Sequence, residues 1–423
     1  MIIDFSITNF RSIKEEQLFS LYAENSLTHL NNNIAYPAGN KIGVLRSAGI
    51  YGANASGKSN LLLAFEALRY IVGECGDLKD GDTIPCYEPY RLSDSTKNAD
   101  TSFEIEFFTD ENVRFIYSVT FNANEFIKES LDFYPGIHKA NIFKRDIGQS
   151  WEDISFGGQY KGGRKKFAFF KNNSYLAKAG NSADSPQIIR SVYNYFRRSI
   201  FHIGASETVM VIDWADDTNI VKKIAYILSK VDSGISGITF EKNDNSNEMK
   251  LPDDIPNKLK EIIINSNKLK TLFSHKTEND DFEYFDKKLE SSGTIKLFNL
   301  LPVIIRSLDK GRVLILDELD NSFHPHIAEL IIKLFQDPIV NINNAQLIFT
   351  THNINLMSPK LLRRDQLWFT EKIDGATTLY SLDEYDKKSV RSNSPYSKWY
   401  DEGRFGAIPN IDTHKIFSAF KDR

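Results

Sequence analysis

The 423-residue sequence contains little cysteine and no long apolar run. Its two cysteines, Cys75 and Cys86, are too few for a disulfide framework, and they lack the further Cys and His residues that a zinc site needs. No apolar stretch reaches the roughly 18 to 20 residues that span a bilayer. The first ten residues alternate apolar and polar side chains, which is typical of a strand and not of a signal peptide. We therefore expect a cytoplasmic protein with no membrane partner.

Neither sign of charge dominates the sequence. Its 52 Lys and Arg against 56 Asp and Glu leave a formal net charge of -4, so a contact with nucleic acid would need a local basic patch. Hydrophobic residues make up 41% and aromatics 12%, which is ample material for a packed interior. The length exceeds that of a single core, and we expect one large domain with a smaller inserted or appended one.

Apolar periodicity predicts the order of the elements. The apolar pattern before Lys58 predicts strands that lead into a glycine-rich loop. The spacing over Lys58–Tyr70 predicts a helix, so this region is typical of the start of an α/β unit. Alternating runs within Tyr87–Phe133 predict an antiparallel meander. Gln187–Ser199 and Asn219–Val231 have helical spacing but no sustained heptads, which favours a compact lid over a long coiled-coil arm.

A phosphate-binding loop is the strongest motif. GANASGKS matches GxxxxGK[ST], follows the apolar run Ala48–Tyr51 and precedes a helix, which distinguishes it from a chance glycine turn. In such a loop the backbone N–H groups surround phosphates, Lys58 reaches the β and γ phosphates, and Ser59 ligates Mg²⁺. The sequence therefore predicts an ATP site with Mg²⁺. The predicted nucleotide-binding residues here are Gly52, Asn54, Ser56, Gly57, Lys58, Ser59 and Asn60.

Two later apolar runs end in polar clusters. Val313–Leu316 is followed by Asp317, which would hold Mg²⁺ through its water shell, and by Glu318, which would polarise the attacking water. Alone, this pattern could be a buried strand with an ordinary acidic turn, but the phosphate loop upstream favours the catalytic interpretation. A second strand precedes His352. A single histidine after a strand is more often structural, yet its place behind the two acids favours a γ-phosphate sensor.

Further motifs resemble a known family. Leu289–Thr294, at the start of a helix, looks like the ABC signature in its Ser-Ser-Gly form, although Glu290, Ser292 and Thr294 depart from the usual residues. Similar matches are NFRSI at Asn9–Ile13, DELDNSFHP at Asp317–Pro325, TTHN, and GRFGAIP at Gly403–Pro409. Together they resemble ABC-type AAA family ATPases of the SMC, RecF and OLD-like clade found in bacterial anti-phage systems, similar to PARIS AriA and abortive-infection ATPases.

This resemblance implies an α/β fold: an ABC-type P-loop nucleotide-binding domain with a mixed sheet and an antiparallel β subdomain, plus a compact helical insertion. The implied division is an N-terminal lobe over 1–185, a helical insertion over 186–280 and a C-terminal lobe over 281–423. It also implies that Arg11 approaches the phosphates and that Asp320–His324 crosses a dimer. The Gln of the usual Q-loop has no clear match, although Glu88–Arg91 lies roughly where it belongs.

The signature also has a physical interpretation. Ser291, Ser292 and Gly293 at a helix N-terminus offer hydroxyl and N–H groups to an anion, and could bind the γ-phosphate held by another subunit. They could also merely cap the helix, and both roles use the same groups. The composite site predicts a homodimer or a higher homo-oligomer.

Two functions remain open. The first is an ATP-driven sensor and switch for a separate effector, which we expect to be a Toprim or OLD-type nuclease, triggered by a phage-derived molecule or nucleic acid. About seventy residues follow His352, which we expect to be too few for a nuclease domain. The alternative is a RecF-like DNA-binding ATPase in DNA repair. A transporter ATPase fits the motifs less well.

A basic stretch could bind a partner. Cations interleave with aromatics in this stretch, a mixture that could follow phosphates and stack bases, or could be a solvated hairpin with its rings turned inward. The residues are Tyr160, Lys161, Arg164, Lys165, Lys166, Phe167, Phe169, Phe170 and Lys171.

Overall fold

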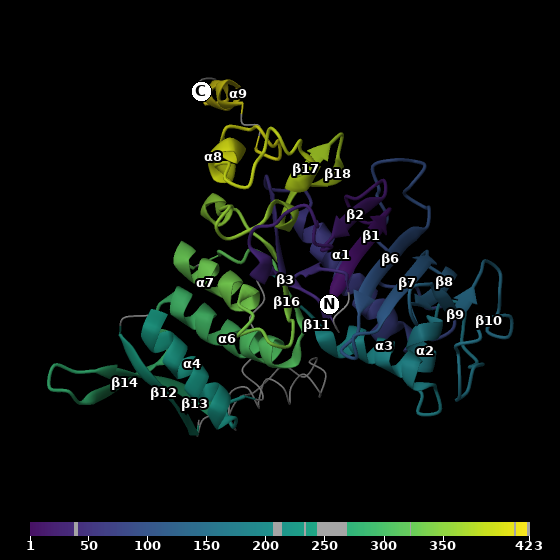
Figure 1. Cartoon of the computed structure of the whole chain (residues 1–423), viewed down its shortest axis with the longest axis horizontal. Helices are drawn as coiled ribbons and strands as arrows, with labels where there is room; N and C mark the ends of the chain where they lie inside the picture. The colour runs from purple at the N-terminus through teal and green to yellow at the C-terminus, as the bar shows by residue number, and fades with distance from the viewer. Residues whose placement is uncertain are drawn as a thin grey trace.

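The computed structural model describes residues 1–37, 41–205, 214–231, 234–242, 269–321, 323–409 and 412–420. Two large sheets organise this part of the chain (Figure 1). The first is a six-stranded sheet of order β11-β15-β16-β5-β17-β18, in which only β18 is antiparallel to its neighbour. Its strands are β5 (Ser47–Gly52), β11 (Ile200–Ile203), β15 (Val313–Leu316), β16 (Gln346–Thr350), β17 (Leu367–Ile373) and β18 (Ala376–Ser381).

The six-stranded sheet is covered on both faces, which explains its continuous apolar runs. Because side chains alternate along a strand, Ile315 and Ile348 face one core while Leu314 and Leu347 face the other. Helices α1 (Lys58–Gly73) and α3 (Gln187–Ser199) belong to the first core, and α6 (Ser292–Lys310) and α7 (Pro325–Gln336) to the second, as Figure 1 shows.

The second sheet has seven antiparallel strands in the order β10-β9-β8-β7-β6-β1-β2. Its inner face packs on α1, where the Phe5 and Phe65 rings lie 4.4 Å apart between centroids. The predicted meander is confirmed by β6, β7 and β8, which pair consecutively. The strands are β1 (Ile2–Thr8), β2 (Gln17–Ser20), β6 (Thr101–Phe108), β7 (Arg114–Phe121), β8 (Phe126–Phe133), β9 (Ala140–Arg145) and β10 (Ser155–Phe156).

A smaller three-stranded sheet of order β12-β13-β14 is joined to α6 by a short 3-10 helix. It packs beside α4 (Thr218–Val231), and its strands are β12 (Ile235–Lys242), β13 (Leu269–Lys276) and β14 (Phe282–Asp286). Among the described residues, the remaining strands are β3 (Ile34–Ala35) and β4 (Val44–Leu45), and the remaining α-helices are α2 (Tyr175–Gly180), α8 (Tyr396–Asp401) and α9 (Thr413–Ser418). Short 3-10 helices span Asn31–Asn33, Cys75–Asp77, Lys287–Leu289, Ile354–Leu356, Arg364–Gln366 and Leu382–Glu384.

The predicted α/β class, with a mixed sheet and an antiparallel subdomain, is confirmed. The helix at Gln187–Ser199 has the predicted bounds, and the helix expected over Asn219–Val231 begins one residue earlier. The division at residues 185 and 280 stays a prediction, and the described part of 186–280 contains strands as well as helices. Among the described residues, no helix combines the length and apolar character needed to cross a membrane.

Candidate nucleotide-binding site

Three predicted motifs lie at one edge of the six-stranded sheet. Strands β15, β16 and β5 are parallel neighbours, so their carboxyl ends lie side by side. The phosphate loop leaves the end of β5, the acidic pair leaves β15, and His352 follows β16. Ligands of open α/β sheets bind at this edge, and the topology therefore places the three motifs around one site.

The phosphate loop needs its glycines. Gly57 precedes α1 with φ 111°, and a Cβ built there would lie 2.1 Å from Thr377 Oγ1. A Cβ on Gly52 would lie 2.5 Å from the carbonyl oxygen of Thr370. Ala55 also has a left-handed backbone, with φ 62°. The loop is held in a conformation that a side chain at either glycine would disrupt.

Hydroxyl groups from β17 and β18 support this loop. Ser56 and Thr370 share a hydrogen bond of 2.6 Å between their hydroxyls, and Thr377 Oγ1 donates to Ser56 O at 2.8 Å. The Ser12 and Thr377 hydroxyls are 2.7 Å apart, and Asn60 Nδ2 donates to Ser12 Oγ at 2.6 Å. The sequence prediction missed the two threonines, which belong to no motif and lie more than 300 positions away from Ser56.

Lys58 is buried at the centre of the loop. Its ammonium group donates to Gly52 O at 2.9 Å and to Ala53 O at 3.1 Å. Burial lowers the pKa of this lysine, while the carboxylates of Asp317 and Glu318 act in the opposite direction. These acids therefore lie within electrostatic reach of the lysine. The first two motifs share one site.

Thr350 organises the acidic pair. Its hydroxyl donates to Asp317 Oδ1 at 2.5 Å and accepts from the backbone N–H of Glu318 at 2.8 Å. Glu318 has φ 52°, a left-handed conformation that is uncommon for a non-glycine residue and occurs at functional sites. Asn321 Nδ2 donates to Glu318 Oε2 at 3.3 Å. Sequence analysis gave Thr350 no role, although its position at the end of β16 was a usable signal.

The next threonine holds the segment that follows the acids. Thr351 Oγ1 donates to Asp320 Oδ1 at 2.5 Å and accepts from the N–H of Asn353. Asp320 begins the segment expected to cross a dimer, of which Ser322 lies outside the described residues. The two consecutive threonines of TTHN thus tie β16 to the loop after β15.

His352 is exposed beside these groups. Partial desolvation lowers its pKa, Lys58 lowers it further, and the carboxylates of Asp320, Glu318 and Asp317 raise it. This pattern places the ring near both the lysine and the acids. With its pKa below the usual 6.5, the imidazole is neutral at pH 7, and one ring nitrogen can accept a hydrogen bond while the other donates.

The residues fit a magnesium ion bound together with a nucleotide. Ser59 is exposed on the first turn of α1, and Asp317 keeps a carboxylate oxygen that Thr350 does not engage. Mg²⁺ commonly takes one or two protein oxygens and completes its shell with phosphate and water. Within the described ranges, no group of three or more His, Cys, Asp and Glu side chains could hold a metal ion.

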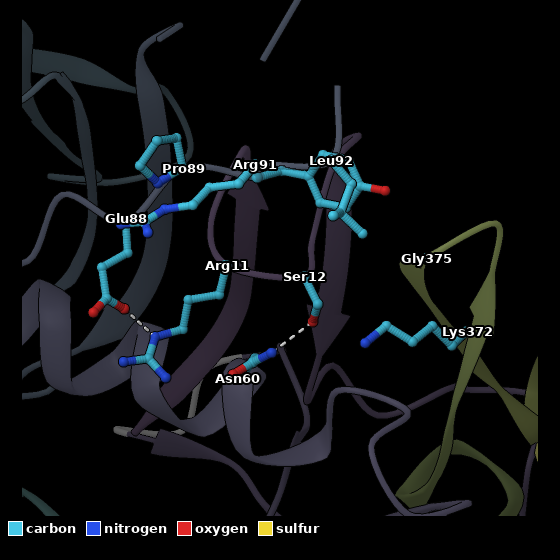
Figure 2. Close-up of a pocket in the computed structure, with 10 residues that line it drawn as sticks. Arg11, Ser12, Asn60, Glu88, Pro89, Arg91, Leu92, Lys372 and Gly375 are labelled. Carbon is cyan, nitrogen blue, oxygen red and sulfur yellow. Dashed lines mark hydrogen bonds and ion pairs between the residues drawn. The ribbon is translucent and has the colours of Figure 1, made fainter. Parts of the chain in front are cut away.

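A pocket of about 440 Å³ lies beside the start of α1 (Figure 2). In it, the Arg11 guanidinium pairs with the Glu88 carboxylate, and the Arg11 N–H donates to Glu88 O at 2.6 Å. Arg11 has a left-handed backbone with φ 50°, and with Ser12 it brings the NFRSI segment into the lining of this pocket. The stretch Glu88–Arg91, considered for the Q-loop, lines the same pocket. Its lining residues are Arg11, Ser12, Asn60, Glu88, Pro89, Tyr90, Arg91, Leu92, Lys372 and Gly375.

The serine-rich turn caps α6. The Ser291 side chain accepts from Thr294 N at 3.1 Å, so its capping role is confirmed. Ser291 and Ser292 are exposed, while Gly293 is partly buried in the first turn. Among the described residues, no hydrogen bond joins these serines to residues 52–60. Their predicted contact with the γ-phosphate of another subunit stays a prediction.

The departure at Glu290 has a structural cause. His275 Nε2, from β13, lies 2.7 Å from Glu290 Oε1, and both side chains are largely buried. The Phe285 ring packs edge-on against His275, with centroids 5.0 Å apart. The three-stranded sheet is therefore bonded to the residue directly before Ser291.

Among solved structures, the chain is similar to an SMC head domain from Thermotoga maritima, with 13% identity, a TM-score of 0.39, and coverage of 90% of this chain and 98% of that chain. It is also similar to the ATP-bound recombination mediator RecF, with 12% identity, a TM-score of 0.36, and coverage of 90% and 97%. No curated protein sequence matches.

A family model covers residues 47–358, from β5 through the phosphate loop, the serine-rich turn and the acidic pair to the loop after His352. This range is well over half of the chain. Within this range, the phosphate loop, the acidic pair and His352 lie at the carboxyl edge of the six-stranded sheet described above. The chain thus belongs to the ATPase family described as "AAA domain, putative AbiEii toxin, Type IV TA system".

Proposed function

We propose that the protein binds ATP with Mg²⁺ and hydrolyses it between two copies of the chain. The observation that carries this proposal is that the phosphate loop, the acidic pair and His352 follow three neighbouring parallel strands at one sheet edge, where Thr350 bonds Asp317 and Glu318. A lysine held among acids at a glycine loop is suited to the β and γ phosphates. The neighbouring pocket of about 440 Å³ offers space for the ribose and base.

Each side chain has a distinct task in this proposal. Lys58 and the N–H groups of the loop neutralise the phosphates, and Glu318 orients and deprotonates the attacking water. A bound Mg²⁺ would supply charge stabilisation, held by Ser59 and by Asp317. His352 contacts the γ-phosphate as a neutral ring and reports its presence. Arg11 exchanges its Glu88 partner for phosphate oxygens.

The serine-rich turn supplies the second half of the site. Ser291, Ser292 and Gly293 of one copy approach the γ-phosphate held by the other, so that ATP closes a homodimer or larger ring. Their exposure at the N-terminus of α6 supports this contact, because helix N-termini favour anions. Hydrolysis then opens the assembly.

We propose further that this cycle switches a separate effector in defence against phage. The toxin–antitoxin system named in the family description supports a two-component arrangement. The effector class that fits is a nuclease of the Toprim or OLD type, and the trigger is a phage-derived molecule or nucleic acid. Pull-down from cells followed by mass spectrometry tests this part, and recovery of the chain without any nuclease would count against it.

The ATPase proposal is tested with Glu318→Gln, which keeps the size of the side chain and removes the base. We expect this variant to bind ATP, to hydrolyse it at least about 100-fold more slowly, and to elute as a closed dimer in ATP. Lys58→Ala serves as the control that neither binds ATP nor dimerises. Hydrolysis at the normal rate by Glu318→Gln would exclude it as the base. Strong stimulation of the wild type by DNA, steeply reduced by salt, would favour the RecF-like alternative.

A further inference from the structure

A second hollow lies between the turn after α1 and the segment before α2. Its volume is about 460 Å³. Aromatic rings of Trp151, Phe169 and Phe170 line it, together with the ammonium-bearing side chains of Lys79 and Lys178. Phe170 is 48% exposed, so that part of its ring is accessible to a ligand. The function proposed above makes no use of this hollow.

The walls of the hollow are preformed. Asn173 Nδ2 donates to Cys75 O and Leu78 O, both at 2.9 Å, and so fastens the segment before α2 to the turn after α1. Asn172 Nδ2 makes two similar bonds, to Lys79 O at 2.7 Å and Asp82 O at 2.8 Å. Both asparagines are 1% exposed. A ligand would therefore enter a cavity whose shape is already set, which reduces the entropic cost of binding.

A buried cation packs against Phe169, one of the rings that line the hollow. Arg145 is 3% exposed, and its guanidinium carbon lies 5.1 Å from the centroid of Phe169. Its Nη1 and Nη2 atoms donate to the carbonyls of Asn173 and Lys171, and its Nε atom has no hydrogen-bond partner among the described residues. Phe169 is thus fixed in place from behind, with its ring available as one wall.

The basic stretch singled out from the sequence borders this hollow. Tyr160 and Phe167 are buried, so the inward-facing interpretation holds for these two rings and not for Phe170. Within the described ranges, none of the exposed cations of the stretch forms an ion pair with a carboxylate, in contrast to Lys139 and Lys144 nearby. These exposed cations are Lys161, Arg164, Lys165, Lys166 and Lys171.

We propose that the hollow and the basic stretch form a binding site for single-stranded nucleic acid. An unpaired base stacks on Phe170 and Trp151, and the backbone phosphates on either side meet the exposed cations of the basic stretch. A duplex keeps its bases paired and stacked on one another, so no base face is free to stack on Phe170, and the aromatic hollow favours a single strand. Asp77 on the rim disfavours a free anion and leaves the base as the group that enters.

Fluorescence anisotropy with labelled 15-nucleotide strands tests the proposal on the full-length protein. We expect single strands to bind more tightly than the duplex of the same sequence. Phe170→Ala should weaken this binding roughly 5- to 100-fold. Lys165→Glu combined with Lys166→Glu should weaken it as well and reduce the slope of log affinity against log salt by about 1.4. Parallel measurements with DNA and RNA strands identify which sugar is preferred, and tight binding of either supports the site.

Matched controls separate this site from general electrostatics and from the ATP site. Lys360→Glu with Lys388→Glu makes the same change of charge on exposed lysines elsewhere and should leave binding unchanged. Lys58→Ala should bind the strands as the wild type does, so a failed ATPase proposal would leave this result intact. Equal affinity for duplex and single strand, or wild-type binding by a folded Phe170→Ala protein, would overturn the proposal.

Discussion

Replacing Thr350 by valine tests how the acidic pair is held. Valine has nearly the same shape, but it removes the hydroxyl that donates to Asp317 and accepts from Glu318 N–H. The site is 0% exposed, so water cannot easily replace the lost partner. An orphaned backbone N–H costs about 1–3 kcal/mol, and we expect a loss of that size in the free energy of unfolding.

Thr350→Val should slow hydrolysis as well as destabilise the fold. Groups that orient a metal ligand typically contribute 10- to 100-fold in metal affinity or activity. We therefore expect the ATPase rate at limiting Mg²⁺ to fall about 10- to 100-fold, with partial recovery at high Mg²⁺. The assay is the initial rate of phosphate release across a Mg²⁺ titration, with urea unfolding measured on the same preparation.

Thr351→Val is the matched control for this prediction. The Thr351 hydroxyl is equally buried and also makes two hydrogen bonds. Its partners are Asp320 and Asn353, neither of which is a proposed metal ligand. We expect a similar loss of stability with an unchanged Mg²⁺ dependence. A folded Thr350→Val protein whose rate and Mg²⁺ midpoint equal those of the wild type would refute the assignment of Asp317 as a metal ligand positioned by Thr350.

Three further predictions follow from the geometry. Gly57→Ala should lower the free energy of unfolding by about 1–3 kcal/mol and abolish ATP binding, because Gly57 has a φ of 111° and a Cβ there would lie 2.1 Å from Thr377 Oγ1. Gly73→Ala is the control, since a Cβ at Gly73 would meet no atom within 4 Å, and it should have neither effect. The check is urea unfolding with ATP-binding titration. The lowered pKa of His352 makes protonation unfavourable in the folded state, so its contribution to stability is complete above pH 6.5 and is lost as the pH falls through the lower folded value. His352→Asn should remove this contribution from the fall of the unfolding free energy at acidic pH. An unchanged pH dependence in the variant would contradict the lowered pKa of His352. Single replacements of Glu290 or His275 by leucine should each destabilise the protein and weaken ATP-dependent dimerisation. In a double-mutant cycle, the double replacement should destabilise the protein by about 0.5–3 kcal/mol less than the sum of the two single replacements. A coupling energy of zero would show that the 2.7 Å contact does not position the turn.

The nucleotide-binding motifs could be found from the sequence because each is local. In GANASGKS, the glycines, the lysine and the helix start lie within one short segment, and the conformation that each requires is set by its near neighbours. The same reason explains the bounds of α3, where one apolar face repeats at helical spacing over Gln187–Ser199. Parallel strands ending in polar residues also predicted that the acidic pair and His352 would meet at one edge.

Tertiary structure alone decided which residues support that edge. Thr370 and Thr377 stabilise the phosphate loop from more than 300 positions away, and the Glu290 partner arrives from β13. A hydroxyl on a strand has the same local pattern whether it faces a loop or solvent, so its partner depends on how the sheets pack. Tertiary structure also decided that Phe170 is exposed while Phe167 is buried, because the burial of a side chain depends on the whole fold and not on the residue type alone.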